Sequence, residues 1–182
     1  MAVNVARRGV PAPSPTETAL EGAFLALHSN VRRAHVAPLT AAGTMDVSHG
    51  SHWIAAVLIR LMNLPPAGAA QPVRLVVTSD GNELEWRRQF GTALLRTRQR
   101  ATGTTIVERN GLGRIVFSVR AVDGALVYHQ LSMSVAGIPV PACVAPRVES
   151  RVSSTTGGWH VDVRVTWRAH FVCRYAGCMA AA

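Results

Sequence analysis

Two charged residues, Arg88 and Glu108, interrupt rows of apolar residues in the middle of the chain. Successive side chains of a strand point to opposite faces. In the run 83–90, Arg88 therefore shares a face with Trp86. In the run 104–109, Glu108 shares a face with an apolar residue in the same way. An interior cation beside an interior carboxylate would form a ligand site, because an unpaired buried charge is very costly. A bulged strand whose Arg88 points to water is the alternative, and alternation alone does not decide between the two.

A histidine, His129, lies in a third apolar row, which runs from Val127 to Val135. An imidazole inside a barrel can act as a general base near neutral pH, although a hydrogen-bonded structural histidine is the more common case. Tyr128 falls on the opposite face and joins His129 only if the strand is twisted or bulged. His129 and Glu108 are therefore the candidate catalytic residues. The predicted ligand contacts are Arg88, Trp86, Tyr128 and Trp167.

Few patterns in the sequence would hold a metal or a cofactor. His49 and His52 flank a strand-to-helix junction, and a His-x-x-His pair can bind zinc, but no third ligand is evident. Cys143, Cys173 and Cys178 form no Cys-x-x-Cys pair. The sequence also lacks a phosphate loop, a dinucleotide-binding fingerprint and an EF-hand loop. We therefore expect no metal and no cofactor.

Two helices are expected in the first third of the chain, on either side of a strand over 41–50. Ser14 can cap a helix over about 15–29, with Pro15 at its first position and Glu17 completing a capping box. A second helix is expected over 51–64, where a Pro-Pro pair ends it. Its expected buried stripe consists of Trp53, Val57, Leu61 and Leu64.

The chain after Gln71 has the pattern of antiparallel strands. Asp-Gly and Asn-Gly pairs between alternating runs are strong hairpin signals. The predicted strands are 72–79, 83–90, 93–100, 104–109, 114–122, 125–135 and 147–155. The stretch 159–175 alternates almost throughout and is too long for a single strand, so we expect a hairpin bend near 168–170.

These elements predict a mainly β (α+β) fold with two N-terminal helices. About nine strands in meander order close most simply into a calycin-like β-barrel or form a strongly curled sheet, and closure removes exposed edges. Such a barrel has room for one small ligand, and the helix over 51–64 could plug one mouth. We expect a disordered tail over 1–13 and a single β-barrel-like domain over 14–182.

The composition limits the class of protein. The chain has 182 residues, 48% of them hydrophobic, which is enough for one domain with a sizeable core. Its net charge is +9 and all 19 basic residues are arginine, but they are spread along the strands and only 5% of residues are aromatic, which argues against nucleic-acid binding. No run is long enough for membrane insertion. An odd number of cysteines and the lack of a secretory signal favour the cytoplasm.

The order of several short motifs between Leu20 and Gly177 resembles a bacterial family catalogued only as the domain of unknown function numbered 4166. The motifs are Glu85–Gly91, Val107–Gly111, Gly137–Pro141, Ala145–Arg147 and Arg174–Gly177. Members occur alone or attached to a Rossmann-type reductase resembling saccharopine dehydrogenase. The resemblance therefore implies a small-molecule setting and such a reductase as a candidate partner, but no catalytic residues. The chain departs from the family pattern at Leu95–Thr97 and at His49, and both changes could mean an altered ligand.

Two main interpretations of function follow. The first is a binding module that holds a largely apolar molecule with a carbonyl or carboxylate end. The second is a cofactor-free enzyme of the isomerase, cyclase or hydratase type, with His129 or Glu108 as acid–base in the same cavity. Only the second requires a titratable group with a shifted pKa inside the cavity. A structural partner that docks through an exposed sheet face is the remaining alternative.

Overall fold

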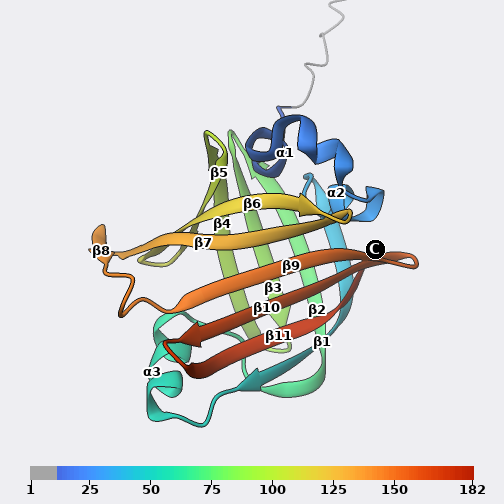
Figure 1. Cartoon of the computed structure of the whole chain (residues 1–182). Coiled ribbons are helices and arrows are strands. Elements are labelled where there is room, and N and C mark those ends of the chain that lie inside the picture. Colours follow the sequence, from blue (N-terminus) through green and yellow to red (C-terminus); the bar gives the residue numbers. More distant parts are fainter. Residues whose placement is uncertain (1–11) are drawn as a thin grey trace, which may run out of the picture.

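The computed structural model describes residues 12–182, which form a closed antiparallel barrel of ten strands with helical segments at both ends (Figure 1). Before the first strand come α1 (Pro15–Leu20), the 3-10 helix η1 (Glu21–Ala26) and α2 (Ser29–Ala34), and after it comes α3 (Trp53–Leu61). The strands are β1 (Leu39–His49), β2 (Gly68–Asp80), β3 (Glu83–Phe90), β4 (Ala93–Thr102), β5 (Thr105–Asn110), β6 (Gly113–Val122), β7 (Ala125–Val135), β8 (Ile138–Val140), β9 (Arg147–Thr155), β10 (Gly158–Trp167) and β11 (His170–Ala181). The predicted tail lies outside the described residues, apart from Ala12 and Pro13.

Most strands pair with their neighbours in sequence, and two further pairings close the ring. Each strand from β1 to β7 pairs antiparallel with the next, as do β9, β10 and β11, and β11 returns to β1. β7 joins β9 over a short register, from Leu126 opposite Val152 to His129 opposite Glu149. Closure pairs both sides of every strand in the ring and so removes exposed edges. The predicted barrel is therefore confirmed, and the curled sheet is not formed.

Strand positions agree closely with the predictions, with two differences. Residues 68–70 extend β2 beyond its predicted start at residue 72, and Gly68 pairs with Val47 of the long strand β1. Residues 138–140, for which no strand was predicted, form the short β8 against the end of β7. The hairpin bend near 168–170 is confirmed, since β10 ends at Trp167 and β11 begins at His170.

The N-terminal helical segments cover one end of the barrel. Ser14 caps α1 as predicted, its Oγ accepting a 3.2 Å hydrogen bond from the backbone N–H of Glu17. The predicted single helix is nevertheless wrong, because the chain turns at Glu21, whose φ is 50°, and continues as η1 and α2. This turning path lets the chain follow the barrel rim, where the N–H of His28 donates to the carbonyl of Gly124 at 2.9 Å.

The other helix, α3, lies at the opposite end with its predicted stripe reversed. Trp53 and Leu61 are 70% and 77% exposed, whereas Ala55 is fully buried. Leu58 and Met62 pack against the core instead. The helix is apolar on nearly all sides, so periodicity could not show which side faces the barrel. The expected burial is therefore wrong for Trp53, Val57 and Leu61, whereas Leu64 packs against the core as expected.

A β-bulge in β7 decides which side chains of that strand face inward. Leu131 has no partner on β6, so alternation shifts at this residue. Met133 is buried after the bulge, but before it the buried residue is Tyr128, and His129 is exposed. The prediction that His129 lies in the interior is therefore wrong, and Tyr128 takes the inward position.

Glycines allow close contact between strands where β1 meets β11. A Cβ added at Gly177 would overlap the backbone carbonyl oxygen of Thr44, and one at Gly43 would overlap that of Cys178. Both obstacles are backbone atoms of the paired strand, which cannot move without disturbing the ladder.

Replacing Gly177 with Ala is therefore expected to lower the free energy of unfolding by roughly 2–4 kcal/mol. The matched control is Gly22→Ala, because no atom lies within 4 Å of the Cβ it would add. Its effect should stay within about 0.5 kcal/mol. Urea denaturation of both variants measures the difference, and equal effects would contradict the close approach of β1 and β11.

Candidate functional site

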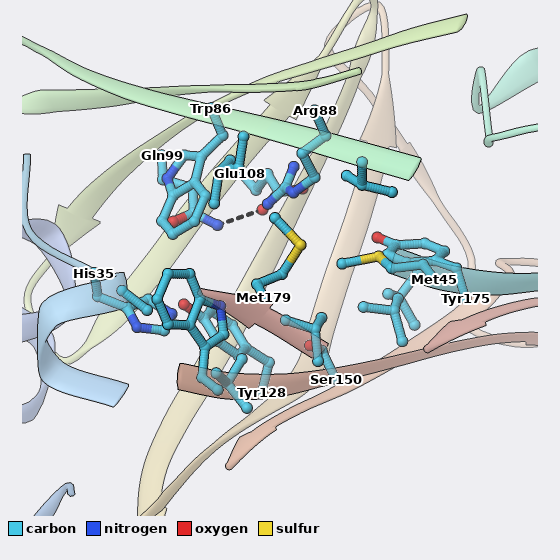
Figure 2. A pocket seen from close by; sticks show the side chains of 18 of the residues that line it. His35, Met45, Trp86, Arg88, Gln99, Glu108, Tyr128, Ser150, Tyr175 and Met179 are labelled. Atoms are coloured by element: carbon cyan, nitrogen blue, oxygen red, sulfur yellow. Dashed lines mark hydrogen bonds between the residues drawn. The ribbon is translucent and has the colours of Figure 1, made fainter. Parts of the chain in front are cut away.

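The barrel interior contains a cavity of about 80 Å³ (Figure 2). A space of this size holds several water molecules. Apolar side chains from most of the strands form the greater part of its wall. The polar groups that converge on it are His35, Arg88, Gln99, Glu108, Tyr128, Ser150 and Tyr175. An apolar wall with a few converging polar groups is typical of a small-molecule site.

Arg88 reaches this cavity from β3. Its guanidinium carbon lies 5.0 Å from the ring centroid of Trp86, and one terminal nitrogen donates a 3.1 Å hydrogen bond to Oγ1 of Thr97 on β4. In residues 12–182, no carboxylate lies within ion-pair distance of Arg88. An arginine has five N–H donors, and only one hydrogen bond to residues 12–182 is formed here. Most of the donors of Arg88 are therefore available to a bound molecule.

Glu108 enters the same cavity from β5. Its Oε2 accepts a hydrogen bond from the side-chain amide of Gln99, drawn as a dashed line in Figure 2. Arg88 and Glu108 therefore share the cavity but do not form the ion pair that the sequence suggested. The strand β4 lies between β3 and β5, so these two strands are about 9–10 Å apart. Each of the two charged groups is instead hydrogen-bonded to a side chain of β4, Arg88 to Thr97 and Glu108 to Gln99.

His35, at the end of α2, is a cavity residue that the sequence analysis missed. Its side chain is buried, and Nδ1 lies 2.8 Å from the carbonyl oxygen of Val31. Because a carbonyl can only accept, Nδ1 carries the proton and Nε2 keeps a free lone pair. Burial and, to a smaller extent, the charge of Arg88 lower the pKa of His35 to about 4, and the Val31 hydrogen bond only partly opposes them. The ring is therefore neutral at pH 7.

Two tyrosines complete the polar part of the wall. Burial raises the pKa of Tyr128 well above its usual range and that of Tyr175 to about 12. Both rings meet a phenylalanine edge to face, Tyr128 with Phe117 at 5.6 Å and Tyr175 with Phe90 at 6.0 Å between centroids. Both phenols therefore stay protonated and rigidly held, and neither is a base near neutral pH.

Two polar atoms of cavity-lining side chains have no hydrogen-bond partner within the described part of the chain. They are Nε1 of Trp86, a donor, and Oε1 of Gln99, an acceptor. Buried polar atoms in proteins nearly always have a partner. A molecule in the cavity that offers both an acceptor and a donor could supply the two missing hydrogen bonds.

The structure brings four of the six predicted residues to the cavity and leaves two outside. The four are Trp86, Arg88, Glu108 and Tyr128. His129 faces outward because of the bulge in β7. Trp167 packs against the edge of the core at the end of β10, and its Nε1 donates to the carbonyl of Val144 at 2.8 Å. Trp167 therefore anchors a loop at the barrel end, and its predicted ligand contact is wrong for this cavity.

The two histidines considered for zinc have structural partners. Nε2 of His49 lies 2.8 Å from the carbonyl oxygen of Pro65, and Nδ1 of His52 accepts from the N–H of Ile54 at the start of α3. In residues 12–182, no group of three or more His, Cys, Asp or Glu side chains is placed to hold a metal ion.

Fold and cavity together define a closed β-barrel whose apolar cavity holds a cation, a carboxylate and a neutral histidine. The chain belongs to a family described as a domain of unknown function (DUF4166), whose model matches residues 27–179. The match confirms the resemblance carried by the motif order. No curated protein and no solved structure matches the chain. Within residues 12–182, the helices are all too short or too polar to cross a membrane.

The buried state of His35 predicts a loss of stability in mild acid. Folding holds the pKa near 4, below the ordinary 6.5, so the unfolded chain binds the proton more readily and stability falls as the pH drops from 6.5 toward 4. Between pH 7 and pH 5 the loss should be about 2 kcal/mol. The His35→Phe variant keeps the aromatic packing but lacks the titrating group. Over this interval, its free energy of unfolding in urea denaturation should therefore fall by about 2 kcal/mol less than that of wild type.

The carboxylate of Glu85 sets the lower limit of the pH range in which the effect of His35 can be measured. Glu85 is surrounded by Arg96, Arg87 and Arg98, and chiefly the Arg96 hydrogen bond lowers its pKa from 4.5 to about 2. Its contribution to stability is present above pH 4.5 and is lost as the pH falls toward 2.

The His35 prediction is refuted if the stability of wild type and of His35→Phe changes in parallel between pH 7 and pH 5, because a neutral buried His35 requires the two curves to diverge.

Proposed function

We propose that the barrel binds a small, largely apolar molecule with a carbonyl or carboxylate end. Arg88 is the observation that carries the proposal: a cation in an apolar cavity, with one hydrogen bond to Thr97 and no ion-pair partner in residues 12–182. Arg88 is half-buried, and a cation partly withdrawn from water without a partner is costly. The planar guanidinium also suits carboxylates and carbonyls, which it can bind with two parallel hydrogen bonds.

The cavity wall suggests how such a molecule would be oriented. Its oxygen end would lie at Arg88, within reach of the unpartnered indole N–H of Trp86. A hydroxyl nearby could donate to Oε1 of Gln99 or to Glu108. The apolar body would lie along the valines and leucines of β2 and β10. This arrangement favours a hydroxylated acid or ketone over a simple hydrocarbon.

The size of the cavity limits the ligand unless side chains move. A space of about 80 Å³ holds only a few non-hydrogen atoms. Met45 and Met179 lie beside it (Figure 2). Methionine has three rotatable bonds and adapts to different packing, so rotation of these two side chains would lengthen the cavity for a larger molecule.

The test is a thermal-shift screen of fatty, polyketide-like and terpenoid acids and ketones. A ligand at about 100 times its Kd stabilises by about 2.7 kcal/mol, which raises the melting temperature by about 5–10 °C for a protein of this size. Arg88→Met should abolish the shift. Arg74→Met is the matched control, because Arg74 is an exposed arginine on the outer face of neighbouring β2, and it should keep the shift.

A cofactor-free acid–base reaction in the same cavity is the second candidate function. The carboxylate of Glu108 and the unprotonated Nε2 of His35 put two proton-accepting groups in one cavity. If the ligand is a substrate, wild type should convert it and Glu108→Gln should bind it with conversion reduced about 100-fold or more. Product analysis by NMR checks this. If wild type binds the ligand without converting it, the enzyme interpretation is excluded and the binding module remains. A Rossmann-type reductase as partner and a cytoplasmic location remain predictions.

A further inference from the structure

One end of the barrel carries an unusual number of exposed apolar side chains. Leu61 on α3, Leu112 in the β5–β6 turn and Ile138 in β8 are 77%, 75% and 71% exposed. Trp53, at the start of α3, is 70% exposed. In Figure 1, β8 and α3 lie on the left of the barrel, away from α1 and α2 at the upper right. Exposed apolar groups gathered on one region mark a site of interaction.

Hydrogen bonds and ring contacts show that these segments form one surface. Asn63 donates to the carbonyl of Leu94, and Asn110 donates to that of Met62. The N–H of Ala136 donates to the carbonyl of Leu112 at 2.9 Å. The rings of His52 and His170 stack at 4.2 Å between centroids. We call the surface formed by residues 50–66, 91–94, 110–114, 135–147 and 168–170 the α3 end.

The charges on the α3 end are all of one sign. Its segments contain no aspartate and no glutamate. Its exposed arginines are Arg60, Arg114, Arg147 and Arg168. The opposite end carries exposed carboxylates as well as arginines, and these carboxylates are Glu17, Glu21, Asp80 and Asp123. The α3 end therefore combines apolar side chains with uncompensated positive charge.

The reversed orientation of α3 contributes to this surface. Trp53, Val57 and Leu61 recur every four residues, so they lie along one side of the helix, and all three are exposed. Leu58 and Met62 hold the helix against the core. The outer apolar stripe is thus not needed for packing against the barrel, yet it remains apolar and has Arg60 beside it.

We propose that the α3 end binds the surface of an anionic phospholipid bilayer at the level of the head groups. Arginines near such a surface are attracted to lipid phosphates, and tryptophan and aliphatic side chains favour the boundary between head groups and acyl chains. Nucleic acid would use the arginines but leave the leucines and Ile138 in water. The apolar tips come from several separate turns, which suits a deformable lipid surface better than a flat protein partner.

The experiment is co-sedimentation of the full chain with vesicles of phosphatidylcholine alone or with part of it replaced by phosphatidylglycerol. We expect binding to the anionic vesicles and little to the neutral ones. Arg60→Gln and Arg114→Gln should each weaken binding about fivefold. Leu61→Ser should weaken it on the order of tenfold.

Matched controls at the opposite end separate surface contact from general effects of charge and hydrophobicity. Leu25 is 74% exposed in η1, so Leu25→Ser removes a similar exposed leucine there, and Arg120→Gln removes an exposed arginine near the same end. Both should bind vesicles like wild type, and all variants should keep its melting temperature. Absence of wild-type binding, equal binding to neutral vesicles, or equal losses in the control variants would each overturn the proposal.

Discussion

Closure of the sheet into a ring is the constraint on which the rest of the structure depends. Once β6 has paired with β7 and β7 with β9, every strand of the ring has neighbours on both sides, and its inward side chains must fill or line one shared interior. Ten strands enclose more space than their side chains occupy near Arg88 and Glu108, and a cavity remains there. The glycines at the β1–β11 seam and the bulge in β7 adjust the strands locally to this closed shape.

The two charged groups in the cavity are each hydrogen-bonded to a side chain of the strand that lies between them. Because β4 separates β3 from β5, Arg88 is held by Thr97 and Glu108 by Gln99, and the two charges do not neutralise each other directly. His35 comes from a different part of the chain and stays neutral because it is buried. The result is a set of donors and acceptors that are fixed in place but only partly satisfied by the protein, which is a suitable basis for recognising a polar end of a small molecule.

The two ends of the barrel differ in chemistry although both carry helices. α1, η1 and α2 bury Leu20, Phe24 and Val31 but leave Leu25 exposed, and they place His35 beside the cavity. α3 is apolar on both sides, so packing one side against the barrel leaves the other exposed, among arginines and without carboxylates. A barrel with an apolar cavity and one apolar, basic end could exchange a poorly water-soluble molecule with a lipid surface, which would connect the two proposals without either depending on the other.

The sequence by itself determined the mainly β class, nearly all the strands, the hairpin near 168–170 and the family, because two-residue alternation and Asp-Gly or Asn-Gly turns are local signals. It also identified Trp86, Arg88 and Glu108, whose regular strands keep their alternation. Only the tertiary structure decided the rest. The bulge in β7 inverts alternation without a sequence mark, so His129 was misplaced. Trp167 lies at the end of β10, where it contacts a loop instead of the cavity. An all-apolar helix does not show its buried side, so the α3 stripe was reversed. His35 became a cavity residue only because closure brings the N-terminal segment onto the barrel mouth, a long-range contact that no local pattern encodes.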